Sequence, residues 1–311
     1  MDSTLYINKC SAYIDFMISK GQWSGLSKND VQTWLRNFHD LSDDEMKLIY
    51  KLLTNIVYFS ENDVIDAVRQ GLYECLQYEV LLRNQLDQNF SLSRSAISNL
   101  ERDCIAQACF IPLLDSYAPY ESGNYINRLL VQQGMISSHQ SVFPDALPEV
   151  VKQYPITKLI IVDDCVGSGD QLTDFWTNSR VMDNGSNMTI SEFCSLHQIR
   201  AKYLSLFGYE DSIQYLRSNL KGIDICCVRL LNNNLRVFSD SSYVWENYNE
   251  RDEALKLLAE LTQAAGVPLR GYKDFDFAFI MHKTIPDWTL PLFWKENTDW
   301  NLLMRRKNSN G

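Results

Sequence analysis

Two adjacent carboxylates, Asp163 and Asp164, lie between an apolar run at residues 159–162 and a glycine-rich stretch at residues 167–169. Paired acids of this kind can accept hydrogen bonds from the neighbouring hydroxyls of a ribose. Backbone N–H groups of a glycine turn, gathered at the start of a helix, can bind a phosphate. These residue types in this order therefore indicate a site for a ribose 5-phosphate.

The flanking pattern predicts the elements that must position these residues. Residues 159–162 are all aliphatic, which is typical of a strand buried on both faces. Leu172, Phe175 and Trp176 form an apolar stripe at helical spacing just after the turn. Ligands of open α/β sheets bind beyond the carboxyl ends of the strands, so this order of strand, turn and helix would present the acids to a ligand.

Other origins of an acidic pair fit less well. A Walker B strand also ends in acids, but no Gly-x-x-x-x-Gly-Lys-[Ser/Thr] motif occurs upstream. A phospho-acceptor receiver domain carries its acids near its own start and has no glycine loop directly after them. An ordinary acidic strand-to-helix connection stays open as an alternative, although the agreement of strand, acids, turn and helix favours the ribose-phosphate site.

The stretch at residues 163–171 resembles the ribose-phosphate loop of type I phosphoribosyltransferases. That loop has two acids, an apolar residue, two variable residues, Thr-Gly, a variable residue and Thr. The resemblance implies that Asp163 and Asp164 are catalytic and ribose-binding residues. It implies a phosphate-binding loop made of Gly167, Ser168, Gly169, Asp170 and Gln171. Gln171 departs from the final Thr, and Asp170 would repel a phosphate unless it points outward or helps to hold a cation.

A second loop, at residues 121–124, contains Ser122 and Gly123 and lies between a short apolar strand and a helix. Type I phosphoribosyltransferases bind the diphosphate of their donor in this place, so the resemblance implies that role for Ser122 and Gly123. Backbone N–H groups at a helix N-terminus would suit it, whereas a simple capped turn is the alternative. Mg²⁺ bound with the donor is the implied cofactor, and the protein residues that would ligate a metal are unknown.

Composition narrows the class of protein. The chain has 311 residues, 45% of them hydrophobic, and a net charge of −10, which favours a large core and argues against a broad nucleic-acid surface. Its eight cysteines show no metal-ligand spacing and are typical of reduced thiols. The charged N-terminal helix is no signal peptide, and no apolar run is long enough for a membrane span. We therefore expect a cytoplasmic protein.

The predicted fold class is α/β. Strands alternate with helices after about residue 105, which predicts a parallel sheet, and the resemblance makes this sheet the core of a type I phosphoribosyltransferase-like fold with a C-terminal β/α hood. The residues before it show only helical patterns, including a capping box at Ser42 and Glu45. We expect an all-helical bundle at residues 1–104, followed by the α/β domain with its hood at residues 105–311.

Two segments have more than one interpretation. The polar stretch at residues 176–200 is either a lid beside the site or an inert surface loop. The segment at residues 284–294 contains two prolines and two tryptophans and is either a base-stacking wall or a packed strap. We expect Trp294 to belong to the core and Trp288 to lie nearer the ligand.

Three spaced motifs are similar to those of a bacterial phosphoribosyltransferase-like family associated with conflict and anti-phage systems. They are Trp-Leu-x-x-Phe at residues 34–38, Asp-Asp-x-x-Gly-Ser-Gly-x-Gln at residues 163–171, and Pro-x-x-Thr-Leu-Pro-x-x-Trp at residues 286–294. The Gln in place of Thr is expected within this family. The resemblance implies a role as an effector in antiviral defence.

The leading functional hypothesis is glycosyl transfer from a ribose-5-phosphate donor such as phosphoribosyl diphosphate. The first alternative is a non-catalytic sensor of nucleotides or ribose phosphates, which the charge of Asp170 and the lack of a lysine-rich loop after the glycine turn favour. The second is an interaction subunit that binds a protein partner through its N-terminal helices, which exposed Trp34 and Phe38 side chains would support. Whether the chain is an enzyme stays open at this point.

Overall fold

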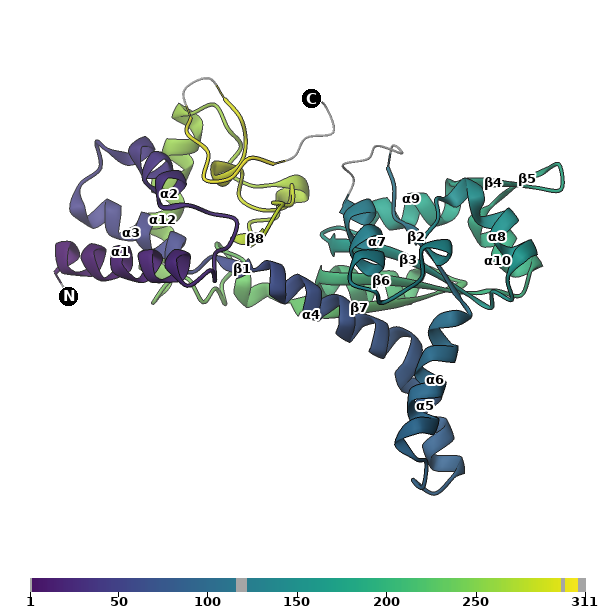
Figure 1. Cartoon of the computed structure of the whole chain (residues 1–311). Helices are drawn as coiled ribbons and strands as arrows, with labels where there is room; N and C mark the ends of the chain where they lie inside the picture. The colour runs from purple at the N-terminus through teal and green to yellow at the C-terminus, as the bar shows by residue number, and fades with distance from the viewer. Residues whose placement is uncertain (1, 116–121, 298–299, 307–311) are drawn as a thin grey trace. The chain divides into compact units, whose positions relative to one another are not determined.

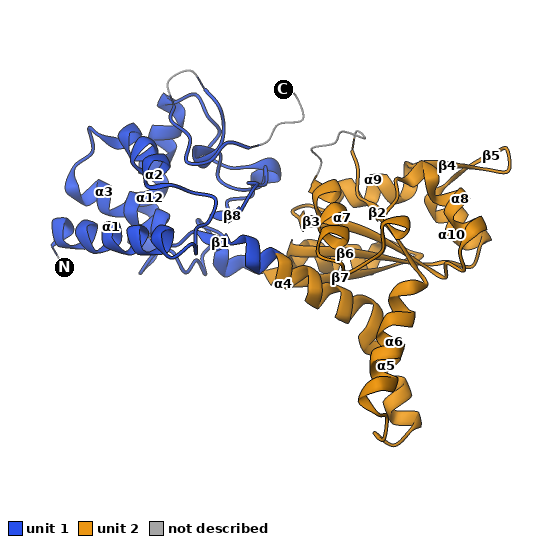
Figure 2. Cartoon of the chain, in the orientation of Figure 1, with its two compact units in different colours: residues 1–64, 232–308 blue, residues 65–231, 309–311 orange. Residues whose placement is uncertain are grey.

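The computed structural model describes residues 2–115, 122–297 and 300–306. The chain forms two compact units, coloured separately in Figure 2. Unit 1 comprises residues 1–64 and 232–308, and unit 2 comprises residues 65–231 and 309–311. Unit 2 is therefore an insertion within the sequence of unit 1. No helix in the described ranges is long and apolar enough to cross a bilayer.

Unit 2 is built on a four-stranded parallel sheet with the order β2-β3-β6-β7 (Figure 1). The strands are β2 Ala108–Pro112, β3 Lys158–Val166, β6 Arg200–Tyr209 and β7 Ile223–Leu231. The central strands β3 and β6 are almost entirely buried, as expected of parallel strands that are covered on both faces. The predicted α/β class and parallel sheet are confirmed.

Helices and one hairpin connect these strands. They are α7 Ser122–Gln132, α8 Leu147–Gln153, α9 Asp170–Asn178, α10 Ile190–Leu196, α11 Glu210–Asn219 and the antiparallel pair β4 Arg180–Asp183 and β5 Ser186–Thr189, with 3-10 turns at Ser138–Gln140 and Pro144–Ala146. Helices α8 to α11 share one hydrophobic cluster with the sheet face that presents Ile161, Tyr203 and Ile225. This cluster fixes the helices that follow the carboxyl ends of β3 and β6.

The opposite face of the sheet is covered by a long helical segment. Alternate residues of a strand point to opposite faces, so this face presents Leu204 and Val228, which lie against Gly71 in α4 (Glu61–Leu72). Helix α4 continues through the π-helical turn Tyr73–Gln77 into α5 Tyr78–Asp87, and α6 Arg94–Ala106 packs beside α5 before the chain enters β2 (Figure 1).

Unit 1 joins the N-terminal helices to the C-terminal segments. Its elements are α1 Ser3–Ser19, α2 Lys28–Leu35, α3 Asp43–Thr54, β1 Val57–Phe59, α12 Tyr248–Ala264 and β8 Phe279–Met281, with 3-10 turns at Arg36–Phe38, Asn233–Leu235, Tyr272–Asp274 and Pro291–Phe293. Strands β1 and β8 pair in parallel. The predicted capping box of α3 is confirmed, because Ser42 and Glu45 each bond the other's backbone N–H group.

The compact units do not follow the expected division between residues 104 and 105. The N-terminal part is not all-helical, since it contains β1, and its helices do not form a separate bundle. They share a core with residues 237–303, in which Trp34 and Phe38 are fully buried. The Trp34 ring packs on Phe293, and the Phe38 ring packs on Trp300. The sequence pattern identified the apolar faces of these helices but carried no signal for the distant segment that covers them. A three-residue strand is also too short to show a period-two pattern.

Two local expectations are also revised. Residues 176–200 form the end of α9, the β4–β5 hairpin and α10 rather than an irregular loop. Trp288 is 4% exposed and stacks on Phe279 with 5.0 Å between ring centroids, and Trp294 is 9% exposed. Both tryptophans are packed within unit 1, as the strap interpretation expects, so Trp288 does not form an open stacking wall.

Candidate functional site

The acidic pair lies near the carboxyl end of β3. The strand continues past Asp163 and Asp164 to Val166, a turn follows, and α9 begins at Asp170. The apolar stripe of α9, Leu172, Phe175 and Trp176, is buried against the sheet. The predicted succession of buried strand, glycine turn and amphipathic helix is therefore confirmed.

Gly169 makes the sharp entry into α9 possible. Its backbone has a φ of +85°, in the left-handed region where side chains are disfavoured. A Cβ at this position would also lie 2.9 Å from the side chain of Leu216 in α11. The left-handed conformation favours glycine, and any larger residue would also force the Leu216 side chain to shift. The first backbone N–H groups of α9 lie just beyond the carboxyl end of β3. Such groups at a helix N-terminus can bind an anion.

Asp163 is the best-connected side chain of the site. It is 2% exposed, and its Oδ1 accepts hydrogen bonds from the Ser122 hydroxyl at 2.7 Å and the Asp164 backbone N–H at 2.9 Å. Its Oδ2 accepts from the Tyr203 hydroxyl at 3.1 Å. Three donors from β3, β6 and α7 therefore fix this carboxylate.

Burial changes the acidity of both carboxyls. Loss of hydration raises the pKa of Asp163 well above its ordinary value, and the neighbouring charge of Asp164 raises it further. The hydrogen-bond donors around Asp163 stabilise its ionised form and oppose this rise. Burial also raises the pKa of Asp164, which is 5% exposed, although hydrogen bonds from Cys165 and Ser122 oppose the shift. Two enclosed acids whose charged forms are penalised are a common feature of functional sites.

The second candidate loop meets the first through Ser122. This residue is the first of α7, and its hydroxyl donates to Asp163. The adjacent Gly123 packs closely on Leu113, which follows β2, and on Val162 of β3, and a Cβ would lie 2.5 Å from the Leu113 carbonyl oxygen. Gly123 therefore has a packing reason to be glycine, whatever it binds. Residue 121 of this loop lies outside the described residues.

The turn itself contains an internal hydrogen bond that the sequence did not indicate. The Ser168 hydroxyl donates to the Asp170 carboxylate at 2.9 Å and accepts from the Asp170 backbone N–H at 3.3 Å. Asp170 and Gln171 are exposed on the first turn of α9, whereas Gly167 is buried. A phosphate bound here would compete with Asp170 for the Ser168 hydroxyl.

Tyr203 is a site residue that sequence reasoning missed. It lies in β6 opposite Ile161 of β3, is fully buried, and donates to Asp163. The available signal was a tyrosine within a predicted buried strand, because a buried tyrosine hydroxyl usually has a hydrogen-bond partner.

The acidic pair can supply part of a magnesium site. In the described ranges, no group of three or more His, Cys, Asp or Glu side chains is placed to hold a metal. Mg²⁺ is commonly held by one or two carboxylates together with substrate phosphates and water. The oxygens of Asp163 accept hydrogen bonds from Ser122, Tyr203 and the Asp164 N–H group. Those of Asp164 accept from Cys165 and Ser122. A magnesium ion on either carboxylate would therefore share it with protein donors.

The parallel sheet, the acidic pair at the end of β3 and the glycine turn at the start of a helix define an α/β protein of the phosphoribosyltransferase-like class. The chain belongs to the PRTase-CE family, whose model matches residues 31–306. The match includes parts of both units. No match is found among curated proteins.

Proposed function

We propose that the chain binds a ribose-5-phosphate donor, such as phosphoribosyl diphosphate, at the carboxyl end of β3 and transfers the phosphoribosyl group to an acceptor. The hydrogen bond between Ser122 and Asp163 carries the proposal. It joins the loop proposed for the diphosphate to the acids proposed for the ribose. Membership of the PRTase-CE family supports the same class of reaction.

Different residues would bind different parts of the donor. The backbone N–H groups of α9, with Ser168 and Gln171, would bind the 5-phosphate, and Ser122 with the start of α7 would face the diphosphate. Asp164 would accept hydrogen bonds from the ribose hydroxyls. Asp163 would fix the geometry around it, since its own oxygens hold three protein donors.

The reaction requires no protein nucleophile. The acceptor forms a bond to the anomeric carbon while the bond from that carbon to the diphosphate oxygen breaks, and the diphosphate leaves with the electron pair. The Asp164 carboxylate near the end of β3 would stabilise the positive charge that develops on the ribose ring. Mg²⁺ bound with the donor would neutralise charge on the diphosphate.

A steady-state assay of diphosphate release, with phosphoribosyl diphosphate, Mg²⁺ and a panel of nucleobases and amines, tests the transfer. We expect release that depends on an acceptor and falls by at least about a hundredfold in Asp164→Asn, as for loss of one charge-stabilising group. Release by Asp164→Asn at the wild-type rate would rule out this site as the reaction centre.

The bond between Ser168 and Asp170 favours one alternative, a non-catalytic sensor of nucleotides or ribose phosphates. An acidic side chain that occupies the loop hydroxyl weakens phosphate binding, which suits a reversible sensor better than a committed enzyme. Tight nucleotide binding without diphosphate release for any acceptor would favour this alternative.

The role in antiviral defence, which the sequence resemblance implies, is part of the proposal. Protection of host cells from phage should be lost in Asp164→Asn at equal expression. Binding of a protein partner through the N-terminal helices would need another surface than Trp34 and Phe38, since both are buried in unit 1.

A further inference from the structure

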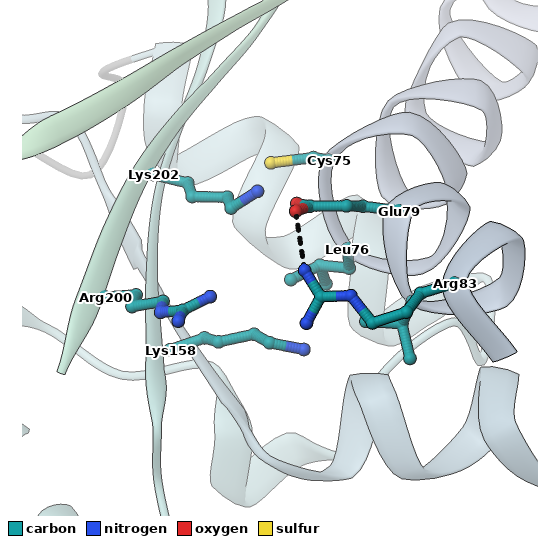
Figure 3. A pocket seen from close by; sticks show the side chains of 8 residues that line it. Cys75, Leu76, Glu79, Arg83, Lys158, Arg200 and Lys202 are labelled. Atoms are coloured by element: carbon teal, nitrogen blue, oxygen red, sulfur yellow. Dashed lines mark ion pairs between the residues drawn. The ribbon is translucent and has the colours of Figure 1, made fainter. Parts of the chain in front are cut away.

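A group of cations lies at the amino-terminal edge of the sheet in unit 2, at the opposite edge from Asp163 and Asp164. The pocket drawn in Figure 3 is lined there by Lys158, Arg200 and Lys202 of the sheet and by Arg83 and Glu79 of α5. We propose that this pocket is a second ligand site, which binds the phosphate group of a small molecule.

Strand register brings the cations together. Lys158 and Arg200 are the first residues of β3 and β6 and pair directly, and Lys202 follows opposite Ile160. Because side chains alternate along a strand, all three project from the same face of the sheet. Figure 3 shows them extending toward α5, from which Arg83 points back.

The cations are poorly neutralised by the protein. Arg83 pairs with Glu79 at 3.5 Å, but both side chains are about 70% exposed, and Lys202 lies 3.8 Å from Asp224, which is 75% exposed. Ion pairs with such exposed partners contribute little to stability. Across the described ranges, Lys158 and Arg200 have no carboxylate within 4.0 Å. Like charges directly opposite on neighbouring strands repel, and a bound anion would relieve that repulsion.

The chemistry of the pocket fits a phosphate. A guanidinium offers a planar fork of donors and a lysine offers a compact charge, and together they recognise phosphate oxygens. Cys75 and Leu76 form a buried apolar floor beside the charges, which lowers the local polarity and strengthens charge pairing. The cations line a small pocket rather than an extended stripe, in a chain with a net charge of −10. This favours a small anion over nucleic acid.

The pocket is separate from the acidic site. Lys158 precedes Asp163 by five residues on the same strand, and at a rise of about 3.3 Å per residue they are separated by roughly 16 Å. A ligand in one place cannot contact the other unless it is extended along the whole strand.

Calorimetric titration of the full chain at constant ionic strength tests the proposal, with inorganic phosphate, inorganic diphosphate and ATP as separate probes. The variant Lys158→Gln/Arg200→Gln should bind at least one probe about tenfold more weakly than wild type, as for loss of charged hydrogen bonds. Arg94→Gln, which removes an exposed cation at the far end of α6, should leave binding unchanged. Stronger binding of ATP than of diphosphate would identify the phosphate group of a nucleotide as the ligand. Equal binding of ATP and diphosphate would identify a free anion as the ligand.

The melting temperature of the double variant shows whether it still folds. Because the double variant loses two opposed like charges, its melting temperature at low salt without added anion should equal or exceed that of wild type. A lower melting temperature would show that the protein already satisfies these cations and would overturn the proposal. Equal binding of the probes by the double variant and by wild type would overturn the proposal. Wild type that binds a single-stranded oligonucleotide but none of the three small probes would also overturn it.

Discussion

At the scale of single residues, the site depends on how a buried carboxylate is held. Asp163 has three donors, and one of them, Tyr203, comes from the neighbouring strand. We expect Tyr203→Phe to lower the free energy of unfolding by about 1–3 kcal/mol, because a buried acceptor loses a partner while the ring volume stays the same. It should also weaken donor binding.

Urea denaturation and a binding titration measure the two effects, with Tyr50→Phe as the control. Tyr50 is a partly buried tyrosine of α3 in unit 1, so its substitution should leave donor binding unchanged. Unchanged stability and binding in Tyr203→Phe would show that this hydrogen bond does not hold the site.

The same carboxylate predicts a pH dependence with an uncommon sign. The pKa of Asp163 is raised above its ordinary value of 3.8, first by burial and then by Asp164, so the folded state keeps a proton that the unfolded chain has lost. The stability that this proton contributes is fully present below the unfolded pKa and is lost as pH rises through the folded pKa.

We therefore expect wild type to lose stability relative to Asp163→Asn, which cannot ionise, between about pH 5 and about pH 8. Urea titrations of both proteins at the two pH values measure the difference. A gain of wild type over the variant as pH rises would mean that the hydrogen bonds from Ser122, Tyr203 and the Asp164 N–H outweigh burial.

At the scale of elements, the start of α9 is the part that should bind phosphate. Asp170 places a negative charge on its first turn and occupies the Ser168 hydroxyl. Asp170→Asn should raise the affinity for a nucleoside monophosphate by roughly threefold or more, because it removes repulsion. It should also lower stability by about 0.3–1 kcal/mol, because an acid at a helix N-terminus is favourable.

Asp174→Asn is the matched control, since it removes an exposed acid one turn further along the same helix. Calorimetry with each variant separates the local effect from the change in net charge. Equal gains from both substitutions would point to a general charge effect, and a loss of affinity in Asp170→Asn would indicate that this acid helps to hold a cation.

Much of this element could be predicted from the sequence. Residues 159–162, the glycine turn and the stripe of Leu172, Phe175 and Trp176 each have a local signature, and strand, turn and helix lie where those signatures predict. The contacts made across the sheet had no such signature. Tyr203 and Ser122 reach Asp163 from elements about 40 residues away in sequence, and the bond from Ser168 to Asp170 depends on side-chain orientation within the turn.

At the scale of the whole molecule, the pairing of distant segments was the least predictable feature. The apolar faces of α2 and α3 were evident, but their partner in unit 1 is the segment at residues 237–303, which follows the whole of unit 2. Sequence order suggested that this segment belonged with the sheet that precedes it. Periodicity identifies a face to be buried and does not identify what buries it.

Trp288 gives a test of this division. Its ring stacks on Phe279 and meets Phe277 edge-on within unit 1. We expect Trp288→Ala to lower the free energy of unfolding by about 3–5 kcal/mol, as for truncation of a large buried aromatic. The affinity of the folded protein for donor should not change. Tyr13→Ala, which truncates an aromatic of α1 that is 43% exposed, should cost far less.

Urea denaturation and a donor titration of the folded fraction measure both quantities. Lost affinity with little loss of stability in Trp288→Ala would restore the interpretation of this residue as a stacking wall for the ligand.

The central claim is that the carboxyl end of β3 binds a ribose-5-phosphate donor, and a calorimetric titration with phosphoribosyl diphosphate and Mg²⁺ tests it most directly. We predict that wild type and Asp174→Asn bind the donor alike, and that Asp164→Asn binds it at least about tenfold more weakly while melting as a folded protein. The absence of binding by wild type at saturating donor, or equal binding by wild type and Asp164→Asn, would contradict the account.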